Sequence, residues 1–121
     1  MESRHIQVGA LSTPEGAVKK KIKAMLNKHG VYSFMPVQNG MGAAALDYHC
    51  AVPPAGLALM VEAKAPGKKA TLRQEVTMQQ MESAGARTIV IDGDNMDELE
   101  ELIATMVLLG EQIVDEEVDK S

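Results

Sequence analysis

The sequence predicts a single α/β domain in which a mixed β-sheet is flanked by helices. The chain has 121 residues, a common size for one domain. Helical and strand-like segments alternate along it, and 45% of the residues are apolar, which is enough for a packed core. The single cysteine excludes an intramolecular disulfide framework and a zinc site built from several cysteines.

The first expected element is a basic helix that begins after Thr13 and ends before Gly30. Thr13 suits the N-cap, Pro14 suits the first helical position, and Gly30 suits the residue after the last turn. Apolar residues recur with helical spacing at Val18, Ile22, Met25 and Leu26. Lysines occupy much of the remaining helix surface, at Lys19, Lys20, Lys21 and Lys23.

Three strands are expected next, over residues 31–38, 46–52 and 57–64. Pro36 predicts an edge position or a bulge for the first strand, because proline has no N–H for the ladder. A glycine-rich loop at 39–42 separates the first strand from the second. A Pro-Pro-Ala-Gly turn joins the second and third strands, so these two strands are interpreted as a possible hairpin.

The second half of the chain predicts a helix over 71–84, a strand over 88–92 and a third helix over 95–109. The strand is fully apolar, which is typical of a buried sheet position. Asn95 and Glu98 fit a capping box at the start of the third helix. The predicted order is α-β-β-β-α-β plus a C-terminal helix, that is, a three-stranded meander followed by a crossover helix and a further strand.

The net charge of −5 is divided unevenly along the chain. From Asp92 onward, eleven acidic residues stand against one lysine, whereas residues 1–91 carry eleven basic residues against six acidic ones. The basic part leaves a polyanionic partner open. We expect one domain over 1–110, followed by an acidic C-terminal tail over 111–121 that frays.

The sequence predicts a cytoplasmic protein with no membrane partner. Its apolar runs are shorter than the roughly 18 residues that a membrane span needs. The first residues are polar and lack the apolar stretch of a signal peptide. A lone cysteine fits a reducing compartment.

Three charged residues near strand ends are the main candidates for chemistry. Asp47 lies in an apolar neighbourhood of the second strand, and Glu62 and Lys64 end the third. Glu62 and Lys64 share a strand face, and hairpin pairing brings Asp47 roughly opposite one of them. Two converging carboxylates suit Mg²⁺ or Mn²⁺, and a lysine beside them can hold a water or offset phosphate charge. The same three residues also fit a plain cross-strand ion pair.

Two further polar residues belong to the same hypothesis. Gln74 follows Thr71 by three residues, which is the spacing of a capping box. Gln74 also shares a helix face with Met78 and Met81, the face that packs on the sheet, from which it can reach the end of the third strand. Glu15, near the start of the first helix, is by itself only a carboxylate favoured by the helix dipole.

Aromatic residues are scarce, with one phenylalanine, two tyrosines and no tryptophan. This scarcity argues against a stacking platform for single-stranded nucleic acid. His49 shares a strand face with Asp47, and we interpret it as a partly buried structural residue, although a role beside Asp47 stays open. Cys50 points to the other face and is interpreted as a small core residue.

Taken together, these motifs resemble the VRR-NUC domain, a branch of the PD-(D/E)XK nuclease superfamily. The resemblance covers roughly residues 12–92 and implies a restriction-endonuclease-like core. The matching segments are Gly42 with Leu46-Asp47, Glu62-Ala63-Lys64, the run from Ala65 to Gln74, and Gly85 followed by an apolar strand.

The resemblance implies a metal centre for Mg²⁺ or Mn²⁺. Asp47 and Glu62 match the family's metal ligands, and the backbone carbonyl of Ala63 matches a further ligand. Glu15 resembles the acidic residue that the family carries on its first helix.

The resemblance also implies the supporting residues of catalysis. Lys64 matches the catalytic lysine, and Gln74 matches the glutamine that supports the site from the helix. Leu46 departs from the family pattern, because a proline usually precedes the motif aspartate. That proline shapes the strand and supplies no ligand, so the departure removes no chemistry.

The activity implied by the resemblance is metal-dependent, structure-specific cleavage of DNA phosphodiester bonds, with Holliday-junction resolution as the best interpretation. Small stand-alone members are typically phage-encoded homodimers, which would place this protein in a bacterial host cytoplasm. The alternatives are a non-catalytic DNA-binding or adaptor protein on the same fold and a flap or nicking nuclease. The basic residues expected to contact phosphates are Lys19, Lys20, Lys23, Lys68, Lys69 and Arg73.

The third predicted helix carries an apolar face that is broader than one sheet contact requires. We expect part of this face, or a strand edge, to form a two-fold dimer interface. A two-fold dimer would place two metal sites to cut two DNA strands symmetrically. The apolar residues concerned are Met96, Leu99, Leu102, Ile103, Met106, Val107 and Leu109.

Overall fold

The computed structural model describes residues 13–37 and 44–120, and for the last two of these only the backbone. The glycine-rich loop at 39–42, including Gly42 of the resemblance, lies outside the described residues. Within the described ranges, no helix combines the length and the apolar character that crossing a membrane requires. The elements are α2 (Pro14–Lys28), β1 (Tyr32–Phe34), β2 (Tyr48–Val52), β3 (Leu57–Ala63), α3 (Leu72–Ser83), β4 (Arg87–Ile91) and α4 (Met96–Lys120).

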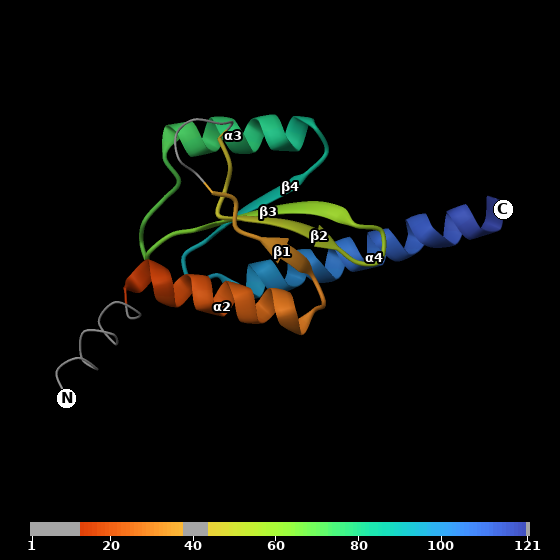
Figure 1. Ribbon diagram of the computed structural model, residues 1–121, viewed down its shortest axis with the longest axis horizontal. Helices are drawn as coiled ribbons and strands as arrows, with labels where there is room; N and C mark the ends of the chain where they lie inside the picture. The colour runs from red at the N-terminus through yellow and green to blue at the C-terminus, as the bar shows by residue number, and fades with distance from the viewer. Residues whose placement is uncertain (1–12, 38–43, 121) are drawn as a thin grey trace.

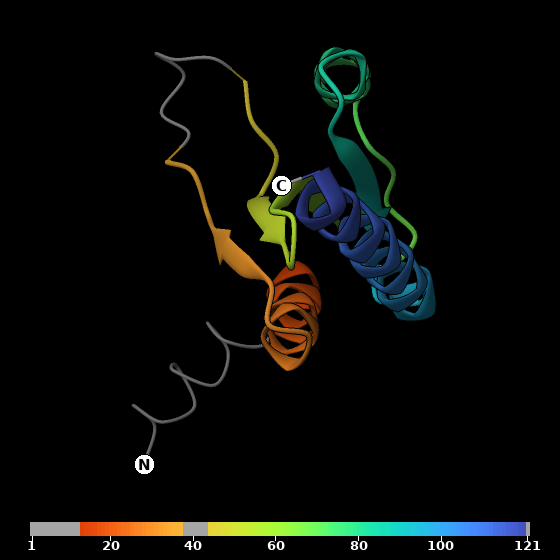
Figure 2. The same ribbon diagram turned by 90° about the vertical axis from the view of Figure 1, so that its right-hand side faces the viewer.

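The four strands form one mixed sheet in the order β1-β2-β3-β4. β1 and β2, and likewise β2 and β3, pair antiparallel, whereas β3 and β4 pair in parallel across the α3 crossover. α2 and α4 cover one face of the sheet, and α3 lies on the other face beside β4 (Figures 1 and 2). The predicted α/β class, the hairpin and the crossover are therefore confirmed.

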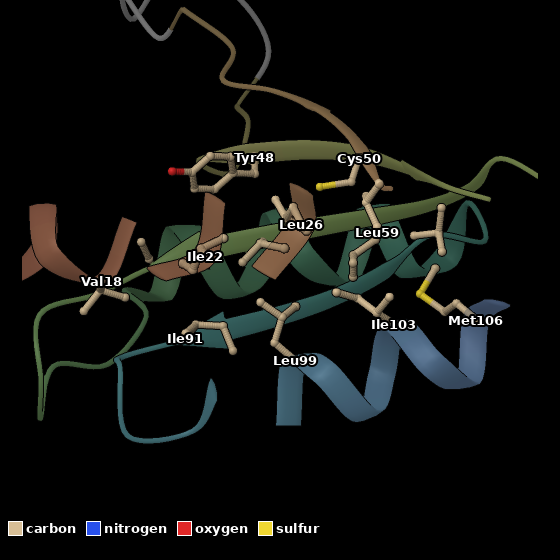
Figure 3. Packing of buried hydrophobic residues seen from close by; sticks show 14 residues of the cluster. Val18, Ile22, Leu26, Tyr48, Cys50, Leu59, Ile91, Leu99, Ile103 and Met106 are labelled. Atoms are coloured by element: carbon tan, nitrogen blue, oxygen red, sulfur yellow. The ribbon is translucent and has the colours of Figure 1, made fainter. Parts of the chain in front are cut away.

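The core lies between the sheet and the helices α2 and α4. Alternate residues of β2 point into it, namely Tyr48, Cys50 and Val52, because side chains along a strand alternate between faces. Figure 3 shows Tyr48 and Cys50 on the side of the sheet that faces the aliphatic side chains of both helices, and Val52 belongs to the same buried cluster. The fully buried members contributed by the helices are Ile22, Leu26, Leu99, Ile103 and Met106.

The predicted strands were too long at several ends. β1 ends at Phe34, two residues before Pro36, whose ring removes the N–H that a longer ladder would need. β2 begins at Tyr48 rather than at residue 46, because the backbone N–H of Asp47 donates to the Glu62 carboxylate. The Asp47 N–H thus bonds to a side chain instead of to the backbone of β3, at the position where the candidate site begins.

The predicted helix over 71–84 is confirmed to within one residue at each end. Thr71 is the N-cap of α3, and its hydroxyl accepts a hydrogen bond from the Gln74 N–H. Ala84 is the C-cap, and Gly85 follows with φ of 101°. A residue in that conformation ends a helix most easily when it is glycine.

The predicted end of the last helix near 109 was wrong. α4 continues through Gly110 to Lys120, so residues 111–120, which were expected to fray, are helical (Figure 1). Gly110 is not a stop here, because its missing side chain makes room for the β2–β3 turn. A Cβ at Gly110 would lie 3.0 Å from Pro54 Cδ and 3.3 Å from the backbone nitrogen of Ala55.

The capping box predicted for Asn95 and Glu98 was also wrong. The Asn95 Oδ1 accepts a hydrogen bond from the Asp92 N–H at 3.0 Å, and its Nδ2 donates to the Val90 carbonyl at 2.9 Å. The side chain therefore closes the β4–α4 loop. Glu98 N–H donates to the backbone carbonyl of Asn95 at 3.0 Å.

Candidate active site

The hairpin register brings Asp47 and Glu62 together. Tyr48 pairs with Val61, so Asp47 and Glu62 are the next opposing residues. The Asp47 N–H donates to Glu62 Oε1 at 3.2 Å, and the Ala63 N–H donates to Asp47 Oδ2 at 2.9 Å. Each carboxylate is thus held by the backbone of the other strand.

Gln74 reaches this pair from the first turn of α3. Its Nε2 donates to Glu62 Oε2 at 2.8 Å, while its Oε1 accepts from the Thr71 N–H at 2.9 Å. The sequence is compatible with a capping box for Gln74 and with a contact to the end of the third strand. Both occur, and one amide makes both contacts.

Two lysines bring positive charge to the carboxylates. Lys64 Nζ lies 3.8 Å from Glu62 Oε2, and the Lys64 side chain is 15% exposed. Lys19 Nζ lies 3.9 Å from Asp47 Oδ1 and 3.4 Å from Glu15 Oε2. Lys19 had been expected to contact DNA phosphate, and its i, i+4 spacing from Glu15 was the available signal for the ion pair.

The carboxyl group of Glu62 is buried, with 6% of its side chain exposed. Burial first, and then the neighbouring Asp47 charge, raise the pKa of Glu62 to about 7 against the opposing effect of the Lys64 charge. Glu15 adds a small increase to the same pKa. Glu62 is therefore a carboxylate whose negative charge is favoured by any additional cation that approaches it.

The donor set fits a hard divalent cation. Each Glu62 oxygen accepts one hydrogen bond and Asp47 Oδ2 accepts another, so both carboxylates keep lone pairs for a metal. Among the described residues, no three Asp, Glu, His or Cys side chains meet in one cluster. Two carboxylates with the Ala63 carbonyl leave positions for water, which is the coordination that Mg²⁺ prefers. Glu15 contacts Lys19 instead and stands at the margin of this set.

The basic residues expected to contact DNA fall into two groups. Lys68, Lys69 and Arg73 are exposed in the loop before α3 and in its first turn, next to Gln74. Lys20 and Lys23 are exposed on α2, and Lys23 Nζ donates to Ser33 Oγ at 3.1 Å. The first group flanks Gln74 along the chain, and the second lies on α2, which begins at Pro14.

His49 and Cys50 lie on β2 after Asp47, and the contacts of both side chains indicate structural roles. Cys50 is buried in the core, as expected, and burial raises the pKa of its thiol to about 11. The imidazole of His49 lies against Phe34 with ring centroids 5.5 Å apart. Burial lowers the pKa of His49, and its Nε2 is a buried atom without a hydrogen-bond partner among the described residues.

Comparison with known proteins identifies no family for this chain. Neither protein-family models nor curated protein sequences match it. The function is therefore argued from the residues and contacts of the site itself.

Proposed function

We propose that this chain is a Mg²⁺- or Mn²⁺-dependent, structure-specific DNA endonuclease built on a restriction-endonuclease-like VRR-NUC fold. The observation that carries the proposal is the reciprocal bonding of Asp47 and Glu62, with Lys64 beside them and Gln74 behind Glu62. A surface ion pair does not require a buried carboxylate next to a second carboxylate. Two adjacent carboxylates of this kind are costly unless a cation offsets their negative charge.

The ligand set would be the carboxylates of Asp47 and Glu62 with the Ala63 carbonyl. When bound there, the cation polarises a phosphoryl oxygen and lowers the pKa of a water ligand. Gln74 holds Glu62 in place through its amide, and the Ala63 N–H holds Asp47. These contacts fix both carboxylates before substrate arrives, which is how a site gains electrostatic preorganisation.

Lys64 supplies the positive charge that phosphodiester hydrolysis requires beside the metal. Its side chain is mostly buried just after the end of β3, and its Nζ lies 3.8 Å from Glu62 Oε2. From there it can orient the attacking water and offset negative charge that develops on the phosphate. Lys68, Lys69 and Arg73 would bind neighbouring phosphates, and such contacts carry no sequence information.

A four-way DNA junction is the preferred substrate in this proposal. The sequence carries no recognisable base-reading motif, so DNA shape is the property that this proposal has it recognise. A two-fold dimer through the apolar side of α4 would present two sites to two strands of the junction. The half-exposed side chains available for this contact are Leu109 and Ile113.

The test is cleavage of a labelled four-way junction, a flap and a linear duplex, each with Mg²⁺, with Mn²⁺ and with EDTA. Glu62→Gln and Lys64→Met remove the two charges with little change in size. Glu100→Gln and Lys28→Met are matched controls, because Lys28 Nζ and Glu100 Oε2 form an ion pair at 3.0 Å on the far half of α2. We expect metal-dependent junction cutting that only the first two variants abolish.

Other outcomes separate the remaining candidates. Cutting of flaps or duplexes alone would keep the site and replace the substrate. Tight junction binding without cutting by folded protein in either metal would contradict an enzyme and favour the adaptor. Equal activity of the Glu62 and Glu100 variants would reduce the cluster to an ion pair.

A further inference from the structure

Large aromatic side chains are usually buried in a protein core, but two of the three aromatic residues of this chain are exposed. One tyrosine, Tyr48, is buried, and its hydroxyl donates to the Lys19 carbonyl at 3.1 Å. Phe34 and Tyr32, by contrast, are 52% and 71% exposed on the edge strand β1. Two large rings left in solvent on one short strand are costly unless they serve a contact.

Both exposed rings lie on the same face of the sheet as the candidate active site. In the antiparallel register Tyr32 opposes Ala51 and Phe34 opposes His49, and opposing residues share a face. His49 in turn opposes Met60 on β3, and Glu62 lies two residues beyond Met60 on the same side of that strand. Phe34, His49 and Met60 therefore form one row across the sheet, and Glu62 lies in the next row on the same face.

This face is covered unevenly. α3 packs along β4 at one edge of the sheet, whereas β1 is at the other edge (Figure 2). Among the described residues, Phe34 has the His49 ring as its aromatic neighbour, and that contact leaves about half of Phe34 exposed. An open aromatic surface thus adjoins a site of carboxylates and lysines.

The chemistry of this surface selects its occupant. Lys64, Lys68, Lys69 and Arg73 attract an anion, while the exposed rings attract a flat apolar group. A nucleic-acid strand carries both features one nucleotide apart, but within a duplex the base faces are already stacked. A base becomes available to an aromatic ring only where pairing and stacking are interrupted.

We propose that Phe34, assisted by Tyr32, stacks on an unpaired base of the DNA strand whose phosphate lies at Asp47 and Glu62. This inference rests on the proposed nuclease function and narrows its substrate class. The substrate is a DNA structure that offers an unstacked base beside the cut position, such as a branch point or the root of a flap. It also revises the expectation that scarce aromatics exclude stacking, because position matters here more than number.

The test is DNA binding without metal, in EDTA, so that no strand is cut. A branched DNA carries 2-aminopurine at successive unpaired positions, and its fluorescence is quenched when an aromatic ring stacks on it. We expect Phe34→Ala to remove the quenching at one position and to weaken binding roughly ten-fold, in line with the usual contribution of base stacking. Phe34→Trp should keep both, and binding to a fully paired duplex should change in neither variant.

Leu72→Ala and Leu108→Ala are controls, because both side chains are more exposed than Phe34 and lie on helices. An abasic residue at the quenched position should make wild-type protein and Phe34→Ala bind equally. Unchanged quenching in Phe34→Ala, or an equal loss with duplex DNA, would overturn the inference. A change in sedimentation of Phe34→Ala would also overturn it, because the face would then join two copies of the chain.

The two proposals fail in different ways. If the wild-type protein neither binds nor cuts any DNA, the proposed function itself is wrong. If it cuts DNA and Phe34→Ala cuts and binds equally well, the nuclease stands and only the stacking role is wrong.

Discussion

Gln74 donates a 2.8 Å hydrogen bond from its Nε2 to the buried Oε2 of Glu62. The other end of the same amide accepts from the Thr71 N–H, which fixes the orientation of the amide. One residue therefore starts a helix and holds a carboxylate on a strand. This link ties the folding of α3 to the geometry of the candidate site.

Gln74→Ala should affect both stability and cleavage. It removes a cap contact and leaves Glu62 Oε2 without a donor, so we expect a loss of about 1–2 kcal/mol in the free energy of unfolding. Thr71→Ala removes the hydroxyl cap but keeps the Gln74–Glu62 contact. It should cost about 1 kcal/mol and leave the rate of cleavage nearly unchanged. Urea denaturation and junction cleavage measure the two effects, and equal cleavage by both variants would contradict the positioning role.

Glu62 should make stability depend on pH in the absence of metal. Its pKa is about 7 in the folded protein and near 4.5 when unfolded, so the folded state binds more protons between these values. The free energy of unfolding therefore falls as pH rises through this window and stays low above it. The loss is at most about 3 kcal/mol. Glu62→Gln cannot titrate and should lack this decrease, as urea denaturation in EDTA at about pH 5 and about pH 8 would reveal.

Glu100 is the control for this pH effect, because its contribution to the free energy of unfolding changes with pH in the opposite direction. Hydrogen bonds from Lys28 and then His29 lower the pKa of this exposed carboxylate. Its contribution is present at neutral pH and is lost as pH falls through its own pKa in the folded protein. Glu100→Gln should keep the Glu62-dependent decrease. If the free energy of unfolding of the wild-type protein rises from about pH 5 to about pH 8, the raised pKa of Glu62 is contradicted.

The core between α4 and the sheet should dominate stability. Ile103 is fully buried among strand and helix side chains, so Ile103→Ala should lower the free energy of unfolding by about 2–5 kcal/mol. Leu108 is on the same helix but is 62% exposed. Leu108→Ala should therefore change the free energy of unfolding by less than about 0.5 kcal/mol. Thermal or urea unfolding distinguishes the two, and comparable losses would contradict the assigned orientation of α4.

The dimer prediction can be tested through α4. Leu109 and Ile113 line an open surface pocket of about 270 Å³ together with Met106, and polar side chains such as Arg87 and Glu116 also line it. We expect the wild-type protein to sediment as a dimer and the double variant Leu109→Asp/Ile113→Asp as a folded monomer. A wild-type monomer in analytical ultracentrifugation at high concentration would contradict a two-fold interface on this helix.

Local patterns predicted most of the fold because each depends on neighbouring residues. The N-caps at Thr13 and Thr71 and the alternation along β2 are all confirmed. The end of α4 was missed because Gly110 resembles a helix stop in sequence. Its actual role depends on Pro54, which is distant along the chain and adjacent only in the folded structure.

The candidate site was predictable where strand pairing alone determined it. The turn and the period of two placed Asp47 roughly opposite Glu62 or Lys64, and in the structure the partner is Glu62. The position of Lys19 between Glu15 and Asp47 depends on how α2 packs across the sheet, which no local pattern contains. The exposure of Phe34 and Tyr32 likewise depends on α3 packing along β4 and away from β1.

Direct metal binding tests the central claim, that Asp47 and Glu62 form a divalent-cation site. Isothermal titration calorimetry with Mn²⁺ would compare the wild-type protein with Asp47→Asn, Glu62→Gln and Glu100→Gln. The account predicts saturable binding to the wild type and to Glu100→Gln, with binding lost in the other two folded variants. Binding of equal strength in all four proteins, or no binding to folded wild type, would contradict it.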